Sequence, residues 1–159
     1  AHAVLWVYKT DPVIQARLRA EAARCNVAPE RLVFATQVDQ ESHLARLQAA
    51  DLALDVLPYG SHTTGSDALW AAVPMLSCRG ETFAGRVGAS LLEAVGLNEL
   101  VTGSLAEYGS ALSGLIRDRD RLAGYKAYLE AERPNLSLFD TAGFTRDFET
   151  MLAAAANAA

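Results

Sequence analysis

A short polar loop between an apolar strand and a helix carries the residues best suited to chemistry. It contains one histidine, two threonines, a glycine and an aspartate: His62, Thr63, Thr64, Gly65 and Asp67. The first backbone N–H groups of a helix have no intrahelical partner and lie at the positive end of its dipole, where they bind phosphates. The pattern therefore predicts a diphosphate site at a strand end, where α/β sheets place their ligands.

A purely structural explanation of the same residues stands beside this one. Thr64 and Asp67, three positions apart, form a variant of the capping box, in which two side chains satisfy the first amides of a helix. Capping alone would account for both residues. His62, which capping does not require, favours a binding site.

Two ungapped motifs are specific enough to indicate a family. Residues 62–75 follow the pattern HTTGxDxLWAxxPM, and residues 80–90 follow GETxAxRVxAS. Both resemble the C-terminal catalytic half of the O-linked N-acetylglucosamine (O-GlcNAc) transferases, a GT-B glycosyltransferase family. A weaker resemblance runs from Val4 to about Phe148.

The resemblance implies roles for the loop residues. Asp67 would accept hydrogen bonds from the ribose hydroxyls of a uridine diphosphate sugar, since a carboxylate has only acceptors. Thr63 and Thr64 would hold the diphosphate with hydroxyl and N–H groups. His62 would stabilise the charge that develops on the leaving diphosphate, which makes it the catalytic candidate.

A second group of residues lies on a predicted helix. His43 and Arg46 are three apart and share one helix face, which could equally be a solvated polar surface. By resemblance, His43 would lie against the uracil and Arg46 nearby. Gln40 stands where animal members carry a lysine that contacts the ribose; it keeps hydrogen-bonding capacity without the charge, so weaker nucleotide binding or the use of backbone groups is expected.

Four residues of the two motifs are expected to be structural. Glu81 and Arg86 are candidates for residues that support the site from behind, although an ion pair or a helix cap is favoured for them. Trp70 and Phe83 are expected in the core and not as stacking platforms.

The composition favours a protein of one domain and argues against a nucleic-acid-binding or a membrane protein. The 159 residues are 51% hydrophobic, enough for one domain with a core, and the net charge of −5 argues against nucleic-acid binding. No apolar run approaches the roughly 18 residues of a membrane span, so a cytoplasmic protein without a membrane segment is expected. Cys25 and Cys78 lack metal-ligand spacing and are expected as buried free thiols.

Alternating strands and helices must position these residues. Strands are expected at 3–8, 31–35, 52–56, 74–77 and 100–101, with helices at 12–25, 40–50, 65–73 and 82–95 between them. Helices alone follow, at 104–118, 120–132 and 141–154. Strands joined by helical crossovers predict a doubly wound, Rossmann-like parallel sheet of the α/β class. We expect one nucleotide-sugar-binding domain over 1–159, truncated at its N-terminal side, with a helical tail at about 104–155 packed on it.

The resemblance implies the donor-binding half of a protein O-GlcNAc transferase. The full enzyme would move N-acetylglucosamine from UDP-GlcNAc to Ser or Thr hydroxyls of an acceptor protein. No cofactor or metal is expected, because helix N-termini and side chains would meet the phosphates. The N-terminal catalytic domain and the tetratricopeptide repeats of the family would lie upstream, so this piece alone is expected to be inactive.

Two other functions fit parts of the sequence. Gln40 is the one hint of a non-catalytic nucleotide-binding or scaffold module. His62 and Asp67 could also serve as an acid/base pair in a sugar-nucleotide epimerase or hydrolase.

Overall fold

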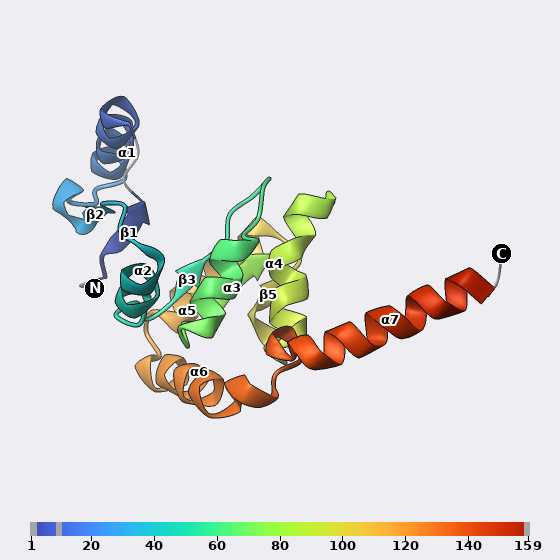
Figure 1. Ribbon diagram of the computed structural model, residues 1–159. Helices are drawn as coiled ribbons and strands as arrows, with labels where there is room; N and C mark the ends of the chain where they lie inside the picture. The colour runs from blue at the N-terminus through green and yellow to red at the C-terminus, as the bar shows by residue number, and fades with distance from the viewer. Residues whose placement is uncertain (1–2, 9–10, 158–159) are drawn as a thin grey trace. The chain divides into compact units, whose positions relative to one another are not determined.

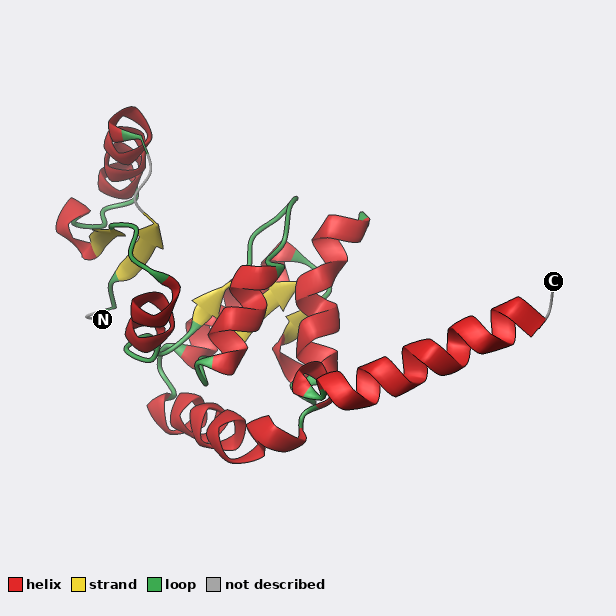
Figure 2. Cartoon of the chain, in the orientation of Figure 1, coloured by secondary structure: helices red, strands yellow, loops and turns green. Residues whose placement is uncertain are grey.

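Strands and helices alternate along the first two thirds of the chain, and helices alone follow (Figures 1 and 2). The computed structural model describes residues 3–8 and 11–157. The chain divides into two compact units, Ala1–His43 and Leu44–Ala159. The α/β class with parallel strands is confirmed, whereas a single domain over 1–159 stays a prediction.

The first unit is built on two parallel strands. β1 (Leu5–Tyr8) pairs with β2 (Leu32–Ala35), with Leu5 opposite Leu32. Between them lie α1 (Pro12–Arg24) and the short helix η1 (Pro29–Arg31). Asp11 begins α1 by accepting a hydrogen bond from the Val13 N–H at 2.7 Å. The Arg19 guanidinium lies 4.8 Å from the ring centroid of Phe34, which ties α1 to β2.

Helix α2 (Gln40–Leu47) starts after a side-chain cap made by Asp39. The Asp39 carboxylate accepts hydrogen bonds from the Ser42 N–H at 2.9 Å and the Ser42 hydroxyl at 2.8 Å. The backbone and side-chain hydrogen bonds from Ser42 hold the pKa of Asp39 below its usual value. The cap fixes the first turn of the helix that carries Gln40 and His43.

The second unit contains a three-stranded parallel sheet in the order β3-β4-β5. Its strands are β3 (Ala53–Leu54), β4 (Met75–Cys78) and β5 (Val101–Thr102). In Figure 1, helices α3 (Thr63–Trp70) and α4 (Phe83–Ala94) lie in front of the sheet, and α5 (Leu105–Leu115) lies behind it. Helices on both faces bury the central strand, so every residue of β4 is buried.

Leucines from α3, β4 and α4 form the centre of the core. Leu69, Leu76 and Leu92 are fully buried. Leu100, at the end of the short helix η2 (Asn98–Leu100), and Leu115 of α5 join the same cluster. Burial of this kind contributes about 1.5–3 kcal/mol per side chain, so the cluster is what holds the loops at the sheet edge in place.

The helices after β5 pack partly on this core. α6 (Arg119–Glu132) buries Leu122 and Leu129 in it, and the Lys126 ammonium donates to the carbonyls of Gln48 at 2.9 Å and Ala50 at 2.7 Å. The short helices η3 (Arg133–Asn135) and η4 (Ser137–Phe139) then lead to α7 (Thr141–Asn157).

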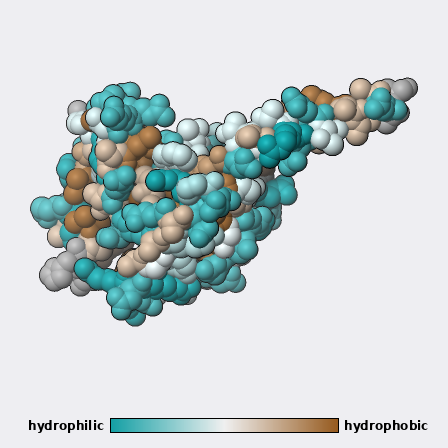
Figure 3. All heavy atoms as spheres, turned by 60° about the horizontal axis from the view of Figure 1, so that its bottom comes forward, coloured by the Kyte–Doolittle hydropathy of each residue, from teal (hydrophilic) through white to brown (hydrophobic). Residues whose placement is uncertain are grey.

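Helix α7 exposes an apolar face, which is made by Phe144, Phe148, Met151 and Leu152. Figure 3 shows brown, apolar residues along this helix beside teal, polar ones. None of the helices in the described ranges is long and apolar enough to cross a bilayer.

The predicted elements are present, and the differences lie at their ends and in burial. β3 ends at Leu54, and Asp55 follows it with a carboxylate that accepts a hydrogen bond from the Ser61 N–H of the loop. Cys25 is exposed rather than buried, since it ends a surface helix, although both cysteines are free. Trp70 and Phe83 are 45% and 80% exposed, so the expectation that they lie in the core is wrong. Phe83 opens α4 and its ring meets the His62 ring edge-on.

Removal of a core leucine should destabilise the second unit strongly. Leu92→Ala is expected to lower the free energy of unfolding by about 2–5 kcal/mol, because it leaves a cavity in the leucine cluster. Leu105→Ala makes the same chemical change where the side chain is 68% exposed, and it should cost under about 0.5 kcal/mol. Urea titration followed by circular dichroism measures both, and equal losses would contradict this description of the core.

Candidate functional site

A buried carboxylate organises the loop between β3 and α3. Asp55 is 4% exposed. Its Oδ1 accepts hydrogen bonds from the backbone N–H of Val56 at 2.9 Å and of Ser61 at 2.6 Å, and its Oδ2 accepts one from the Ser77 hydroxyl on β4 at 2.6 Å. One carboxylate therefore joins the start of the loop, its end and the central strand.

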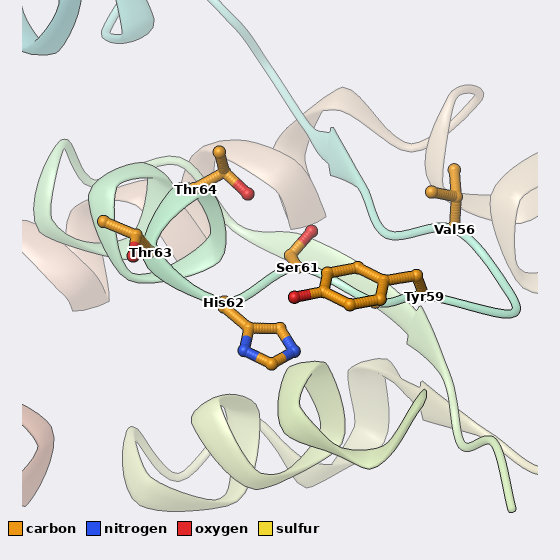
Figure 4. A pocket seen from close by; sticks show the side chains of 7 residues that line it. Val56, Tyr59, Ser61, His62, Thr63 and Thr64 are labelled. Carbon is orange, nitrogen blue, oxygen red and sulfur yellow. The ribbon is translucent and has the colours of Figure 1, made fainter. Parts of the chain in front are cut away.

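The loop lines a cavity of about 400 Å³ at the carboxyl end of the sheet (Figure 4). The lining consists of the loop and the first two residues of α3: Val56, Tyr59, Gly60, Ser61, His62, Thr63 and Thr64. A cavity of this size suits a small ligand, and most of its lining is polar or small.

Helix α3 begins at this cavity without a capping side chain. His62 occupies the N-cap position, and no side chain there accepts a hydrogen bond from the first turn. The six other α-helices in the described part of the chain have such a cap, made by Asp11, Asp39, Thr82, Ser104, Asp118 and Asp140. The capping box of Thr64 and Asp67 is therefore wrong, because α3 starts at Thr63 and Thr64 already lies inside the first turn. An uncapped helix N-terminus is a position where an anion gains hydrogen bonds and dipole stabilisation.

The His62 imidazole lies between two aromatic rings. It stacks on Tyr59, with ring centroids 5.0 Å apart and planes at 12°, and meets Phe83 edge-on at 6.2 Å. Figure 4 shows the Tyr59 and His62 rings side by side at the cavity. The Nε2 atom of His62 is buried without a hydrogen-bond partner among the described residues. A buried polar atom without a partner is uncommon and is satisfied when a ligand reaches it.

Two glycines allow the loop and α4 to approach each other closely. A Cβ atom on Gly88 would lie 2.0 Å from Oδ2 of Asp55, and one on Gly60 would lie 2.9 Å from the carbonyl oxygen of Ala84. The Gly60 N–H also donates to that carbonyl at 3.1 Å. The Asp55 carboxylate therefore occupies a space that exists only because α4 has no side chain at position 88.

Tyr108 of α5 supports the same aspartate from its backbone. The phenol donates a hydrogen bond to the Asp55 carbonyl at 2.9 Å. Burial, followed by the negative charges of Asp55 and Cys78, raises the pKa of Tyr108 to about 12. The phenol is neutral at physiological pH and serves as a donor.

Four of the seven sequence-predicted site residues lie around the start of α3. His62, Thr63 and Thr64 line the cavity, and Asp67 lies partly buried one turn further along α3. Helix α2 carries the other three, with Gln40 exposed and His43 and Arg46 partly buried. Because Gln40 and His43 belong to the first unit and the loop to the second, a shared site for all seven stays a prediction.

The second motif forms a helix start and not an ion pair. Thr82 caps α4 by accepting a hydrogen bond from the Gly85 N–H at 3.1 Å. The Arg86 guanidinium donates to the backbone carbonyls of Glu81 at 2.8 Å and Thr82 at 3.3 Å. Arg86 therefore holds the backbone that leads into α4, while Thr82 makes the cap. The chain also contains one Asp-x-Asp pattern, whose Asp118 caps α6 through the Arg121 N–H at 3.0 Å.

Asp55 is the functional-site residue that sequence reasoning missed. The strand expected over 52–56 includes Asp55, because its neighbours are apolar. The signal that could have found it is an aspartate at the carboxyl end of a buried parallel strand, where a charge needs partners.

Comparison with known proteins gives consistent matches over most of the chain. The family model "Glycosyl transferase family 41" matches residues 1–148. The UDP-N-acetylglucosamine--peptide N-acetylglucosaminyltransferase of Caenorhabditis elegans is 34% identical over 149 residues, and the probable enzyme of that name, SEC, of Arabidopsis thaliana is 33% identical over 149. These matches cover 94% and 93% of this chain but only 13% and 15% of the relatives.

A solved structure agrees with these matches. A mutant of the Thermobaculum terrenum O-GlcNAc transferase superimposes with a TM-score of 0.86 at 36% identity. The alignment covers 94% of this chain and 29% of that structure's chain. The chain therefore spans a small part of each protein that it resembles.

The close approach at Gly88 can be tested with two equivalent helix substitutions. Gly88→Ala is expected to lower the free energy of unfolding by about 1–3 kcal/mol, because the new methyl group collides with Asp55. Gly109→Ala in α5 meets nothing within 4 Å and should raise it by about 0.4–1 kcal/mol, since alanine favours the helix. Thermal or urea unfolding measures both, and a stabilising Gly88→Ala would contradict the described packing.

The Tyr108 hydrogen bond should show in an alkaline titration. The pKa of about 12 in the folded protein exceeds the ordinary tyrosine pKa of 10.0, so the neutral phenol stabilises the fold in full below about pH 10. This stabilisation is lost as the pH rises through about 12. The tyrosinate absorbance of the parent minus that of Tyr108→Phe should therefore rise only near pH 12. A difference curve with its midpoint near pH 10 would contradict the buried hydrogen bond.

Proposed function

Because this chain belongs to glycosyl transferase family 41, we propose that it supplies the UDP-GlcNAc-binding part of a protein O-GlcNAc transferase. The observation that carries the proposal is the uncapped N-terminus of α3, which opens with His62, Thr63 and Thr64 into a cavity at the carboxyl end of a parallel sheet. That is the position in which α/β folds bind nucleotides.

The donor diphosphate would bind at the start of α3. The amides and hydroxyls of Thr63 and Thr64 would donate to the phosphate oxygens, and the helix dipole would add stabilisation of the negative charge. Nε2 of His62, which has no partner within the described residues, would donate to the same diphosphate. The stack with Tyr59 keeps the imidazole ring at the cavity.

This arrangement would lower the barrier by stabilising the leaving group. In the proposed transfer, a Ser or Thr hydroxyl oxygen of the acceptor protein bonds to the anomeric carbon of N-acetylglucosamine, and the bond from that carbon to the diphosphate oxygen breaks. Negative charge then collects on uridine diphosphate, where the His62 donor and the α3 amides act. The hydroxyl proton passes to an acceptor-side group outside this chain.

The nucleoside would be held by the two other groups of predicted residues. The Asp67 carboxylate on α3 would accept hydrogen bonds from the ribose hydroxyls. Gln40, His43 and Arg46 on α2 would surround the uracil and ribose. We expect no cofactor and no metal ion, since amides and side chains serve the phosphates.

The activity of a whole enzyme would need more than this chain. The matched relatives extend far beyond it, since it covers 13% of the Caenorhabditis elegans protein. The acceptor-side catalytic domain and the tetratricopeptide repeats are proposed to lie in those other parts. We propose the cytoplasm as its location and a protein Ser or Thr as the acceptor.

Calorimetric titration with uridine diphosphate tests the proposal. We expect saturable binding by the chain, weakened about tenfold in His62→Ala and in Asp67→Asn, because each removes a charge-assisted or polar contact of about 1.4 kcal/mol. Asp147→Asn changes the same chemical group on exposed α7 and should leave the affinity unchanged. Circular dichroism confirms that each variant is folded.

Two results would contradict the proposed function. One is the absence of binding by the folded parent chain. The other is an equal loss of affinity in Asp147→Asn and Asp67→Asn, which would show that the loss comes from the change in net charge and not from a contact with the nucleotide.

A further inference from the structure

We infer that Asp55 is a positioning residue for the donor diphosphate: its buried carboxylate holds the Ser61 amide and thereby sets the place of His62 and of the first turn of α3. The inference rests on the proposed function and adds a residue that no motif of the sequence contains. Asp55 lies behind the cavity lining and acts through the backbone of the loop.

The Asp55 carboxylate joins the central strand β4 to the loop that precedes α3. Oδ2 is bound to the Ser77 hydroxyl on β4, the central and fully buried strand. Oδ1 is bound to the Ser61 amide at 2.6 Å, one residue before His62. The position of the sheet is therefore transmitted to the residue that precedes the helix N-terminus.

The anchor itself is held in place from several directions. The Val56 amide shares Oδ1, and the Tyr108 phenol holds the Asp55 carbonyl at 2.9 Å. Ser77 is in turn held by the Thr102 hydroxyl of β5, which donates to the Ser77 carbonyl at 3.1 Å. Gly88 leaves space for the carboxylate, which no larger residue would do. The loop, β4 and α4 thus meet the Asp55 side chain, while α5 holds its backbone and β5 holds Ser77.

Removal of the carboxylate would release the loop without touching the ligand. In Asp55→Ala, the amides of Val56 and Ser61 and the hydroxyl of Ser77 lose a common acceptor in a buried place. Buried donors without an acceptor are costly, so these amides and this hydroxyl would bond to water or to other acceptors. The loop would move as a result. The His62 ring and the amides of Thr63 and Thr64 would then leave the arrangement that a diphosphate needs, because binding sites tolerate only small displacements.

The experiment compares three variants of the chain by two measurements. Asp55→Ala removes the anchor, Asp55→Asn keeps an acceptor oxygen of the same shape, and Leu122→Ala removes core packing from α6 as a matched loss of stability. Calorimetry measures the affinity for uridine diphosphate. Amide hydrogen exchange, followed by nuclear magnetic resonance, measures the protection of the Ser61 N–H.

The expected results separate positioning from stability. Asp55→Ala should bind uridine diphosphate about tenfold more weakly or worse and lose the protection of the Ser61 amide. Asp55→Asn should recover both to within about threefold of the parent, because its amide oxygen can accept from Ser61. Leu122→Ala should lose thermal stability while its affinity and its Ser61 protection stay within about twofold of the parent.

Several results would overturn the inference. Binding by Asp55→Ala as tight as that of the parent would do so while leaving the proposed function intact. If Leu122→Ala weakens the binding of uridine diphosphate as much as Asp55→Ala does, the loss of affinity would follow from lost stability and not from the position of the loop. If Asp55→Ala does not fold, hydrogen exchange in the parent chain provides the test. An unprotected Ser61 N–H in the parent would show that Asp55 does not hold this amide. A parent that binds no uridine diphosphate would overturn both the proposed function and the role of Asp55 in it.

Discussion

The second unit depends on how it satisfies one buried carboxylate. A charge that is 4% exposed is expensive unless donors surround it, and the chain supplies two loop amides and the Ser77 hydroxyl. These donors come from the loop and from β4, so the loop cannot move away from the sheet without leaving Asp55 unsatisfied. The small size of Gly88 follows from the same constraint, because a methyl group there would collide with the carboxylate.

The polar groups at the N-terminus of α3 lack partners, in contrast to the Asp55 carboxylate. Among the described residues, α1, α2, α4, α5, α6 and α7 each have a side-chain cap, whereas α3 begins with amides that no side chain satisfies. A missing cap costs about 1 kcal/mol, and the buried Nε2 of His62 adds a second unsatisfied polar group. Both lie at the same cavity, so a ligand with anionic oxygens would satisfy them together. The core of leucines and the Asp55 network supply the stability that this arrangement lacks.

Much of the fold could be predicted from hydrophobic periodicity alone. The apolar runs at β1, β2 and β4 predict strands that the structure contains, because a short run of apolar residues is typical of a strand in a parallel sheet. Element ends were less predictable, as α3 shows by starting two residues before the expected Gly65. The two motifs identified the family, and His62, Thr63 and Thr64 were correctly placed together at a strand end, while their roles in binding remain proposals.

By itself, the sequence determined the class of fold, the order of strands and helices and the family, since these depend on local patterns and on short motifs with defined spacing. Only the tertiary structure decided that Asp55 is an anchor, that Phe83 is exposed beside His62, and that Thr64 and Asp67 form no capping box. For Asp55 and for the contact of Phe83 with His62, the physical reason is separation along the chain. Asp55 meets Ser77 and Gly88, which lie 22 residues and more away, and no local pattern encodes which donors a buried carboxylate will find after the sheet has assembled.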